Sequence, residues 1–368
     1  MAGLYVHIPF CKKRCLYCDF FSTTLLERRG EYVDALLQEI SARKGELNEP
    51  VRTVYIGGGT PSTLDTIDVF RIMRTINAPE AEEVTIEVNP GDITPRYLNE
   101  LRQCGINRLS IGVQSFKDDL LKLLGRRHTA VQAIDAVRMA QQAGFDNISI
   151  DLMYALPEQK KSHWVADIEL ALRLNVQHIS CYGLMYEEGT QLTRLRDKGE
   201  LTPIDEDTEN EMYDYLCQRL AKAGYHHYEV SNFALPGYEA KHNSSYWNGT
   251  PYIGVGAGAH NYLPPIRSWN PDDLSKYMKG VTGYGLQVTG NGIRESESLG
   301  ERELYNERIM LGLRTDQGIA EKDLALSPAG AVQGWIEQDM LRYTDDGRIV
   351  ATQKGIHLLN RIIEDLMI

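Results

Sequence analysis

The chain has 368 residues, a formal net charge of −12 and 42% hydrophobic residues. This length suits one large domain with a smaller one. The acidic balance argues against a nucleic-acid partner, because phosphate binding requires a basic surface. No run approaches the roughly 20 apolar residues that cross a bilayer, and the N-terminus has no secretory pattern. We therefore expect a cytoplasmic protein without a transmembrane segment.

Short apolar, β-branched runs alternate with amphipathic segments in the first half of the chain. We expect strands at residues 4–8, 53–56, 84–88, 108–112, 147–152 and 178–183. Between them we expect helices at residues 31–44, 66–76, 95–104, 130–143 and 162–174. Repeated alternation favours an α/β fold with a parallel sheet and crossover helices. A partial (β/α)6, TIM-like barrel is our expectation, although a doubly wound sheet fits the alternation nearly as well.

The pattern loosens towards the C-terminus. A helix at 205–223 and a strand at 228–233 precede a glycine- and aromatic-rich stretch at 242–260. From about residue 298, helices are followed by two short strands within 341–351 and a last helix, an order similar to a winged helix. We expect this unit to pack rather than bind DNA, because it carries many acidic residues: Glu301, Glu303, Glu307, Glu337 and Asp339. The predicted domains are 1–235, the barrel; 236–297, a connecting segment; and 298–368, a helical, winged-helix-like domain.

Chemically distinctive residues follow the ends of successive predicted strands. They are Cys11, Cys15 and Cys18 after the first, Gly57 to Pro61 after the second, Glu87 and Asn89 at the third, Gln114 after the fourth and Asp151 near the fifth. In a parallel barrel the carboxyl ends of the strands share one face, where the chemistry is located. The sequence therefore predicts that sulfur, glycine backbone, carboxylates and an amide meet on that face.

Three of the six cysteines lie within eight residues, at Cys11, Cys15 and Cys18. Such crowding in an intracellular chain indicates metal chemistry rather than disulfides. Iron–sulfur clusters usually have four cysteine ligands, so three would leave one iron open to a further ligand. A zinc site is the main alternative, with His7 or a distant cysteine as its fourth ligand. A loop without any metal is the remaining alternative.

Several motifs, in chain order, carry a resemblance to a known family. The spacing Cys11-x3-Cys15-x2-Cys18, with Tyr17 before the last cysteine, is similar to the signature of the radical SAM superfamily, and GGGTP at 57–61 is similar to its glycine motif. Other motifs resemble the oxygen-independent coproporphyrinogen III oxidase family, namely YVHIPFC at 5–11, EVNP at 87–90, GVQSF at 112–116 and DLMYALP at 151–157. The resemblance runs over essentially the whole chain.

Within that family the sequence is more similar to the heme chaperone (HemW) branch than to the oxidases. Oxidases carry a further cysteine where this chain has Phe20, and a longer extension than the ten residues before Cys11. The chaperones share an H-N-x-x-Y-W motif, found here from His242 to Trp247, whose histidine is associated with heme. The resemblance implies a radical SAM barrel and a heme chaperone without coproporphyrinogen oxidase activity. The alternative is an oxidase that decarboxylates coproporphyrinogen III in porphyrin biosynthesis.

The resemblance also implies roles for individual residues. Cys11, Cys15 and Cys18 would ligate a [4Fe–4S] cluster, and His242 would bind heme. The residues expected to contact S-adenosylmethionine are Tyr5, Gly58, Gly59, Thr60, Glu87, Gln114, Arg126 and Asp151. Taken alone, these side chains allow ordinary explanations. Glu87 could cap a helix, Arg127 competes with Arg126, and three other histidines compete with His242: His226, His227 and His260.

The expected partners follow from the same resemblance. They are heme and heme-acceptor proteins, with no nucleic acid. A peripheral membrane contact is compatible with the sequence, and so is either a monomer or a dimer that depends on heme or the cluster.

Overall fold

The computed structural model describes residues 2–47, 49–283 and 294–368. Among these residues, twelve strands form one sheet in the order β12-β11-β10-β9-β1-β2-β3-β4-β5-β6-β8-β7. Its central strands run parallel and are β1 (Ala2–Ile8), β2 (Val51–Gly58), β3 (Glu83–Val88), β4 (Arg108–Gln114), β5 (Ile148–Tyr154) and β6 (His178–Gly183). All six expected strands are present.

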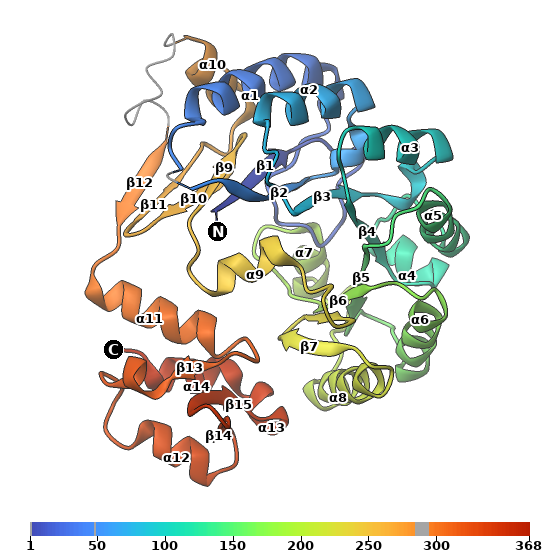
Figure 1. The fold of residues 1–368 in the computed structure, drawn as a ribbon. Helices are drawn as coiled ribbons and strands as arrows, with labels where there is room; N and C mark the ends of the chain where they lie inside the picture. Colours follow the sequence, from blue (N-terminus) through green and yellow to red (C-terminus); the bar gives the residue numbers. More distant parts are fainter. Residues whose placement is uncertain (1, 48, 284–293) are drawn as a thin grey trace.

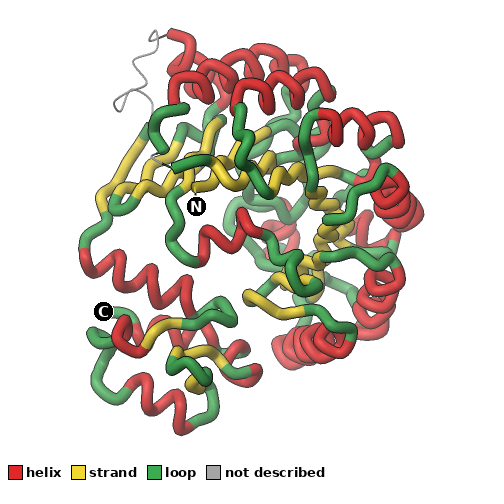
Figure 2. Tube along the Cα trace, in the orientation of Figure 1, coloured by secondary structure: helices red, strands yellow, loops and turns green. Residues whose placement is uncertain are grey.

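Helices cover the outer face of this curved sheet, as Figures 1 and 2 show. They are α1 (Arg29–Arg43), α2 (Thr66–Ile76), α3 (Pro95–Gln103), α5 (Ala130–Gln142), α6 (Lys161–Arg173) and α8 (Glu206–Lys222). Their ends follow local signals in the sequence. The Thr129 hydroxyl and the Gln132 side chain form a capping box at the start of α5. Asn77 ends α2 in the left-handed conformation, at a φ of 50°. The partial α/β barrel is therefore confirmed.

Within the predicted barrel, two short helices were not expected, namely α4 (Asp118–Leu123) and α7 (Gln191–Asp197). The single strand expected at 228–233 is a hairpin of β7 (His226–Glu229) and β8 (Asn232–Ala234). The expectation of one strand was wrong because the chain reverses between Glu229 and Asn232. Strand β8 pairs antiparallel with β6 and extends the sheet on that side.

Residues 236–297 do more than connect two domains. Strand β9 (Tyr252–Val255) pairs in parallel with β1, and three antiparallel strands continue the sheet from it: β10 (His260–Leu263), β11 (Ile266–Trp269) and β12 (Glu295–Ser298). Helix α10 (Leu274–Gly283) packs on α1. Helix α9 (Lys241–Trp247) lies inside the curve of the sheet, close to β2 (Figure 1).

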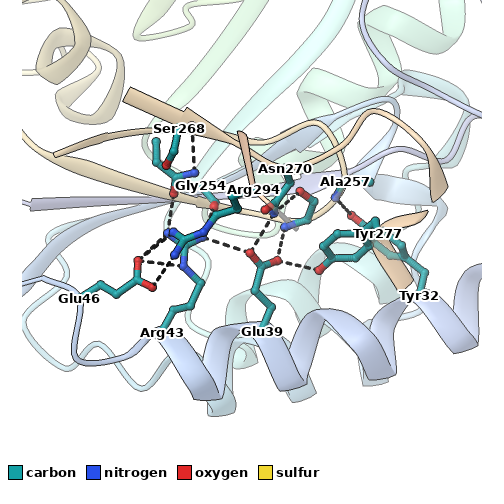
Figure 3. Close-up of polar contacts among 12 residues, drawn as sticks. Tyr32, Glu39, Arg43, Glu46, Gly254, Ala257, Ser268, Asn270, Tyr277 and Arg294 are labelled. Atoms are coloured by element: carbon teal, nitrogen blue, oxygen red, sulfur yellow. Dashed lines mark hydrogen bonds and ion pairs between the residues drawn. The ribbon is translucent and has the colours of Figure 1, made fainter. Parts of the chain in front are cut away.

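A buried polar network anchors this extension to α1 (Figure 3). Glu39 and Arg43 form an ion pair at 3.1 Å, and each side chain is 1% exposed. Glu39 also accepts hydrogen bonds from the Asn270 amide at 2.8 Å and the Tyr277 hydroxyl at 2.7 Å. Arg43 donates to the carbonyl of Gly254 at 2.7 Å. A buried charge is costly unless it is paired, so these bonds fix the position of the strands they reach.

The last part of the chain has its own apolar core, distinct from that of the sheet. It comprises α11 (Glu301–Gly312), α12 (Ala331–Glu337), α13 (Gln353–Ile356) and α14 (Leu359–Leu366), with a small sheet of β13 (Ile319–Ala320), β14 (Leu341–Tyr343) and β15 (Arg348–Ala351). The two strands expected within 341–351 are β14 and β15. No helix in the described ranges combines the length and apolar character that crossing a bilayer requires.

Candidate functional site

A cavity of about 510 Å³ opens at the carboxyl ends of the parallel strands. It collects residues from six successive strands, β1 to β6, as expected for a parallel barrel. Eleven of the predicted site residues line it: Tyr5, Cys11, Cys15, Cys18, Gly58, Gly59, Thr60, Glu87, Gln114, Arg126 and Asp151. His242 is the one predicted site residue that does not line this cavity.

The three cysteines lie on the loop that follows β1. The thiol of Cys11 lies 3.3 Å from the Thr60 hydroxyl, and the Arg126 guanidinium donates to Cys15 Sγ at 3.5 Å. Burial is the largest cause of the pKa shift of Cys18, which rises to about 11. An isolated Cys18 thiolate is therefore disfavoured, and ligation by a cationic centre would supply the missing counter-charge. Three cysteines that line one cavity would supply three sulfur ligands to a cluster that keeps one iron open.

The glycine motif brings its backbone against the cysteine loop. Gly58 has a φ of 117°, in the region that favours glycine. A Cβ on Gly59 would come within 2.9 Å of the Pro9 carbonyl and 3.0 Å of Cys11 Sγ. Both positions therefore require glycine, one for its dihedral angle and the other for close packing. The resulting backbone edge is open to the cavity beside the sulfur atoms.

Two carboxyl groups line the cavity, Glu87 from β3 and Asp151 from β5, on either side of β4. Glu87 accepts hydrogen bonds from the Tyr55 hydroxyl at 2.8 Å and the Gly58 amide at 3.1 Å. Burial raises the pKa of Glu87 to about 7, with a smaller contribution from the charge of Asp151. Burial likewise raises the pKa of Asp151 to about 6, against a bond of 3.2 Å from the Ser110 hydroxyl. Neither carboxyl has an ion-pair partner among the described residues, so a bound cation would find both available.

The neighbouring arginines have different partners. Arg126 donates to the Gly112 carbonyl and to Cys15, and its Nε is buried without a hydrogen-bond partner. Arg127 instead pairs with Asp92 at 2.9 Å. A buried donor without a partner is unusual and indicates a missing acceptor. Arg126 is therefore the better candidate to meet an anionic group in the cavity.

His242 lies deep in the barrel, at the opposite end of the strands. Its side chain is fully buried, and it is adjacent to Gly3 and Thr53 near the starts of β1 and β2. Both ring nitrogens are bonded, Nδ1 to the Thr53 hydroxyl and Nε2 to the Tyr246 hydroxyl, each at 2.8 Å. Burial lowers the pKa of His242 to about 3. Heme binding by His242 stays a prediction, and it would require one of these hydrogen bonds to break.

A second cavity, of about 890 Å³, adjoins the first and shares Tyr5, Asp19 and Phe20 with it. No motif in the sequence predicted this cavity. Its walls come from the cysteine loop, α9 and the strands β9 to β11, which are far apart in the sequence. The dense aromatic content between residues 242 and 269 was the available signal, but this content is equally typical of an ordinary core.

Comparison with known proteins adds independent information. A model of the radical SAM superfamily matches residues 5–171. The chain is similar to the heme chaperone HemW of Lactococcus lactis subsp. lactis (strain IL1403), at 38% identity over 99% of this chain and 97% of that relative. It is 34% identical to the heme chaperone HemW of Bacillus subtilis (strain 168), over 98% and 96%.

A solved structure, the coproporphyrinogen III oxidase (HemN) from Escherichia coli, is similar to the structure of this chain, with a TM-score of 0.82. The match covers 100% of this chain and 90% of that chain, at 23% identity. At this identity the two proteins share a fold, and the likeness carries no statement about activity.

Proposed function

This chain belongs to the heme chaperone HemW family of the radical SAM superfamily, and from that membership we propose that it binds heme and delivers it to acceptor proteins. The observation that carries the proposal is the relationship to the Lactococcus relative, which spans nearly the full length of both chains. Phe20 supports it, because this position carries a cysteine in the oxidases that the sequence also resembles.

We also propose that the first cavity holds a [4Fe–4S] cluster and S-adenosylmethionine. Cys11, Cys15 and Cys18 would ligate the cluster, leaving one iron open. The chemistry that such a cluster supplies is one-electron transfer, which belongs to the cofactor rather than to the protein. The residues of the cavity would bind and orient the cofactor. Three features fit this role: two carboxyl groups without an ion-pair partner among the described residues, the Arg126 Nε without a hydrogen-bond partner, and the exposed glycine backbone.

Each end of S-adenosylmethionine has a complementary group in this cavity. Glu87 would accept hydrogen bonds from the ammonium group, and Arg126 would bind the carboxylate through its planar fork of donors. Gly58, Gly59 and Thr60 would contact the methionine part, and Tyr5 would lie beside the cluster. Gln114 and Asp151 would hydrogen-bond the ribose hydroxyls. These roles are assigned by resemblance and are compatible with the positions of the side chains around the cavity.

The proposal is tested by anaerobic reconstitution with iron and sulfide, followed by titration with heme in the visible spectrum. Coproporphyrinogen III turnover, followed as carbon dioxide release, is run in parallel. We expect saturable heme binding, transfer to an apo-heme protein and no decarboxylation. Decarboxylation would establish the oxidase alternative, and absence of heme binding would refute the chaperone proposal. Replacing the three cysteines together should abolish the iron absorbance.

A further inference from the structure

The second cavity has the character of a site for a flat aromatic ligand. Its volume of about 890 Å³ lies within the range of roughly 300–1,000 Å³ that is typical of cofactor and small-molecule sites. Six aromatic side chains contribute to its walls: Tyr5, Phe20, Phe21, Tyr246, Tyr252 and Trp269. Phe20 is 66% exposed although it is a large apolar residue, and it stands between the two cavities. An apolar macrocycle would cover this exposed surface.

Two histidines line the second cavity, His7 and His260. All nine histidines of the chain lie in described ranges, and eight of them make hydrogen bonds through the ring, including His7, His178 and His242. The ring of His260 makes none, is exposed and lines the second cavity. A ring nitrogen must be free of other bonds to ligate iron. Of the two histidines that line the cavity, His260 meets this condition, whereas the nitrogens of His7 are bonded to the Tyr5 hydroxyl and the Phe21 carbonyl.

The wall that carries His260 is held in place. His260 begins β10 and pairs across the ladder with Trp269 of β11, and the two rings stack at 5.8 Å. Asn270, the residue after β11, donates to the buried Glu39 carboxylate and to the Gly256 carbonyl, both at 2.8 Å (Figure 3). The Trp269 ring fixes the orientation of the imidazole, and the Glu39 network fixes the strand. A preformed wall of this kind reduces the ordering cost of binding.

We propose that the second cavity is the heme site and that His260, rather than His242, is the axial ligand to the iron. This assignment rests on the proposed function and adds its location. His242 lies behind the cavity wall, because its partner Tyr246 lines the cavity while the imidazole packs on Tyr55 at 5.3 Å. In this arrangement His242 holds the Tyr246 ring in the cavity wall through their hydrogen bond and does not contact the ligand itself.

The charged side chains around the cavity determine how a bound heme would be oriented. Lys276 lines it and has no ion-pair partner among the described residues. Three carboxylates also line it, from Asp19, Asp272 and Glu295, and they would repel the propionates of heme. The propionate edge should therefore face Lys276. Charge reversal in Lys276→Glu should weaken heme binding by about three- to tenfold.

The decisive experiment is a heme titration of the full chain and three variants. His260→Ala should weaken binding by at least about tenfold and remove the spectrum of an imidazole-ligated iron. Added free imidazole should restore that spectrum. His242→Gln, checked for folding by circular dichroism, should keep the imidazole-ligated spectrum. His163→Ala is the matched control, because His163 lies on α6, outside both cavities, and should bind heme like the unchanged protein.

Retention of affinity and spectrum by His260→Ala would overturn the assignment, and their loss in folded His242→Gln alone would identify the motif histidine as the ligand. These results differ from a failure of the proposed function, in which the unchanged protein itself would not bind heme.

Discussion

At the residue scale, the adjacent Arg126 and Arg127 make different contacts. Arg126 faces the cysteine cavity, whereas Arg127 is paired with Asp92. Arg126→Ala should weaken S-adenosylmethionine binding by about ten- to a hundredfold, because a hydrogen bond to a charged group contributes about 1.5–3 kcal/mol. Iron content should stay unchanged. Equilibrium binding to the reconstituted protein measures the effect, and Arg127→Ala serves as the control, with a loss below about fivefold.

Glu87 gives the site a dependence on pH. Its pKa is raised to about 7, chiefly by burial, so the carboxyl is neutral below that pH and charged above it. Only the charged form attracts an ammonium group strongly. Affinity for S-adenosylmethionine should therefore rise between pH 6 and pH 8, and Glu87→Gln should flatten this rise. An unchanged pH profile in the variant would show that another group controls binding.

At the scale of elements, Glu39 and Arg43 of α1 pair with each other. Their hydrogen bonds to Asn270 and to the Gly254 carbonyl join α1 to the strands of the second cavity. Arg43→Met leaves a buried carboxylate without its partner, which should lower the free energy of unfolding by about 3–5 kcal/mol. Denaturant unfolding measures this loss. Arg71→Met is the comparison, because the pair of Arg71 with Asp34 is exposed and should contribute less than about 1 kcal/mol.

At the scale of the whole molecule, His226 joins the sheet to the C-terminal unit. Its ring lies 3.0 Å from Glu239 and 2.7 Å from Asp316. Burial alone would lower the pKa of His226, but the bonds to Glu239 and Asp316 outweigh it and raise the pKa. A raised histidine pKa stabilises the folded state below about pH 6.5, the ordinary pKa, and this contribution is lost as pH rises through the folded-state pKa.

The attachment of the C-terminal unit should therefore be firmer at pH 6 than at pH 8. Amide hydrogen exchange of β13 and α11 is the measurement, after correction for the intrinsic effect of pH on exchange. His226→Asn should remove the difference between the two pH values. The effect should stay below about 1 kcal/mol, because the side chain is 42% exposed and water screens the pair.

The sequence alone determined the alternating strands and helices, because strand and helix periodicities are local properties of the chain. It also determined which residues gather at the carboxyl edge, because a parallel sheet places consecutive strand ends on one face. The cysteine spacing and the glycine motif were sufficient to identify the superfamily. Phe20 and the histidine motif were sufficient to distinguish the heme chaperone branch from the oxidases.

Only the tertiary structure decided where His242 and His260 lie. Both are histidines near aromatic residues in one short stretch, and no local pattern distinguishes them. Strand β9 pairs with β1, and the strands after it extend the sheet. In the resulting fold His242 is buried inside the barrel, whereas His260 lines a cavity. That pairing joins residues about 250 positions apart, at Gly3 and Tyr252. Contacts of such separation follow from the packing of the whole chain, which periodicity and motifs do not encode.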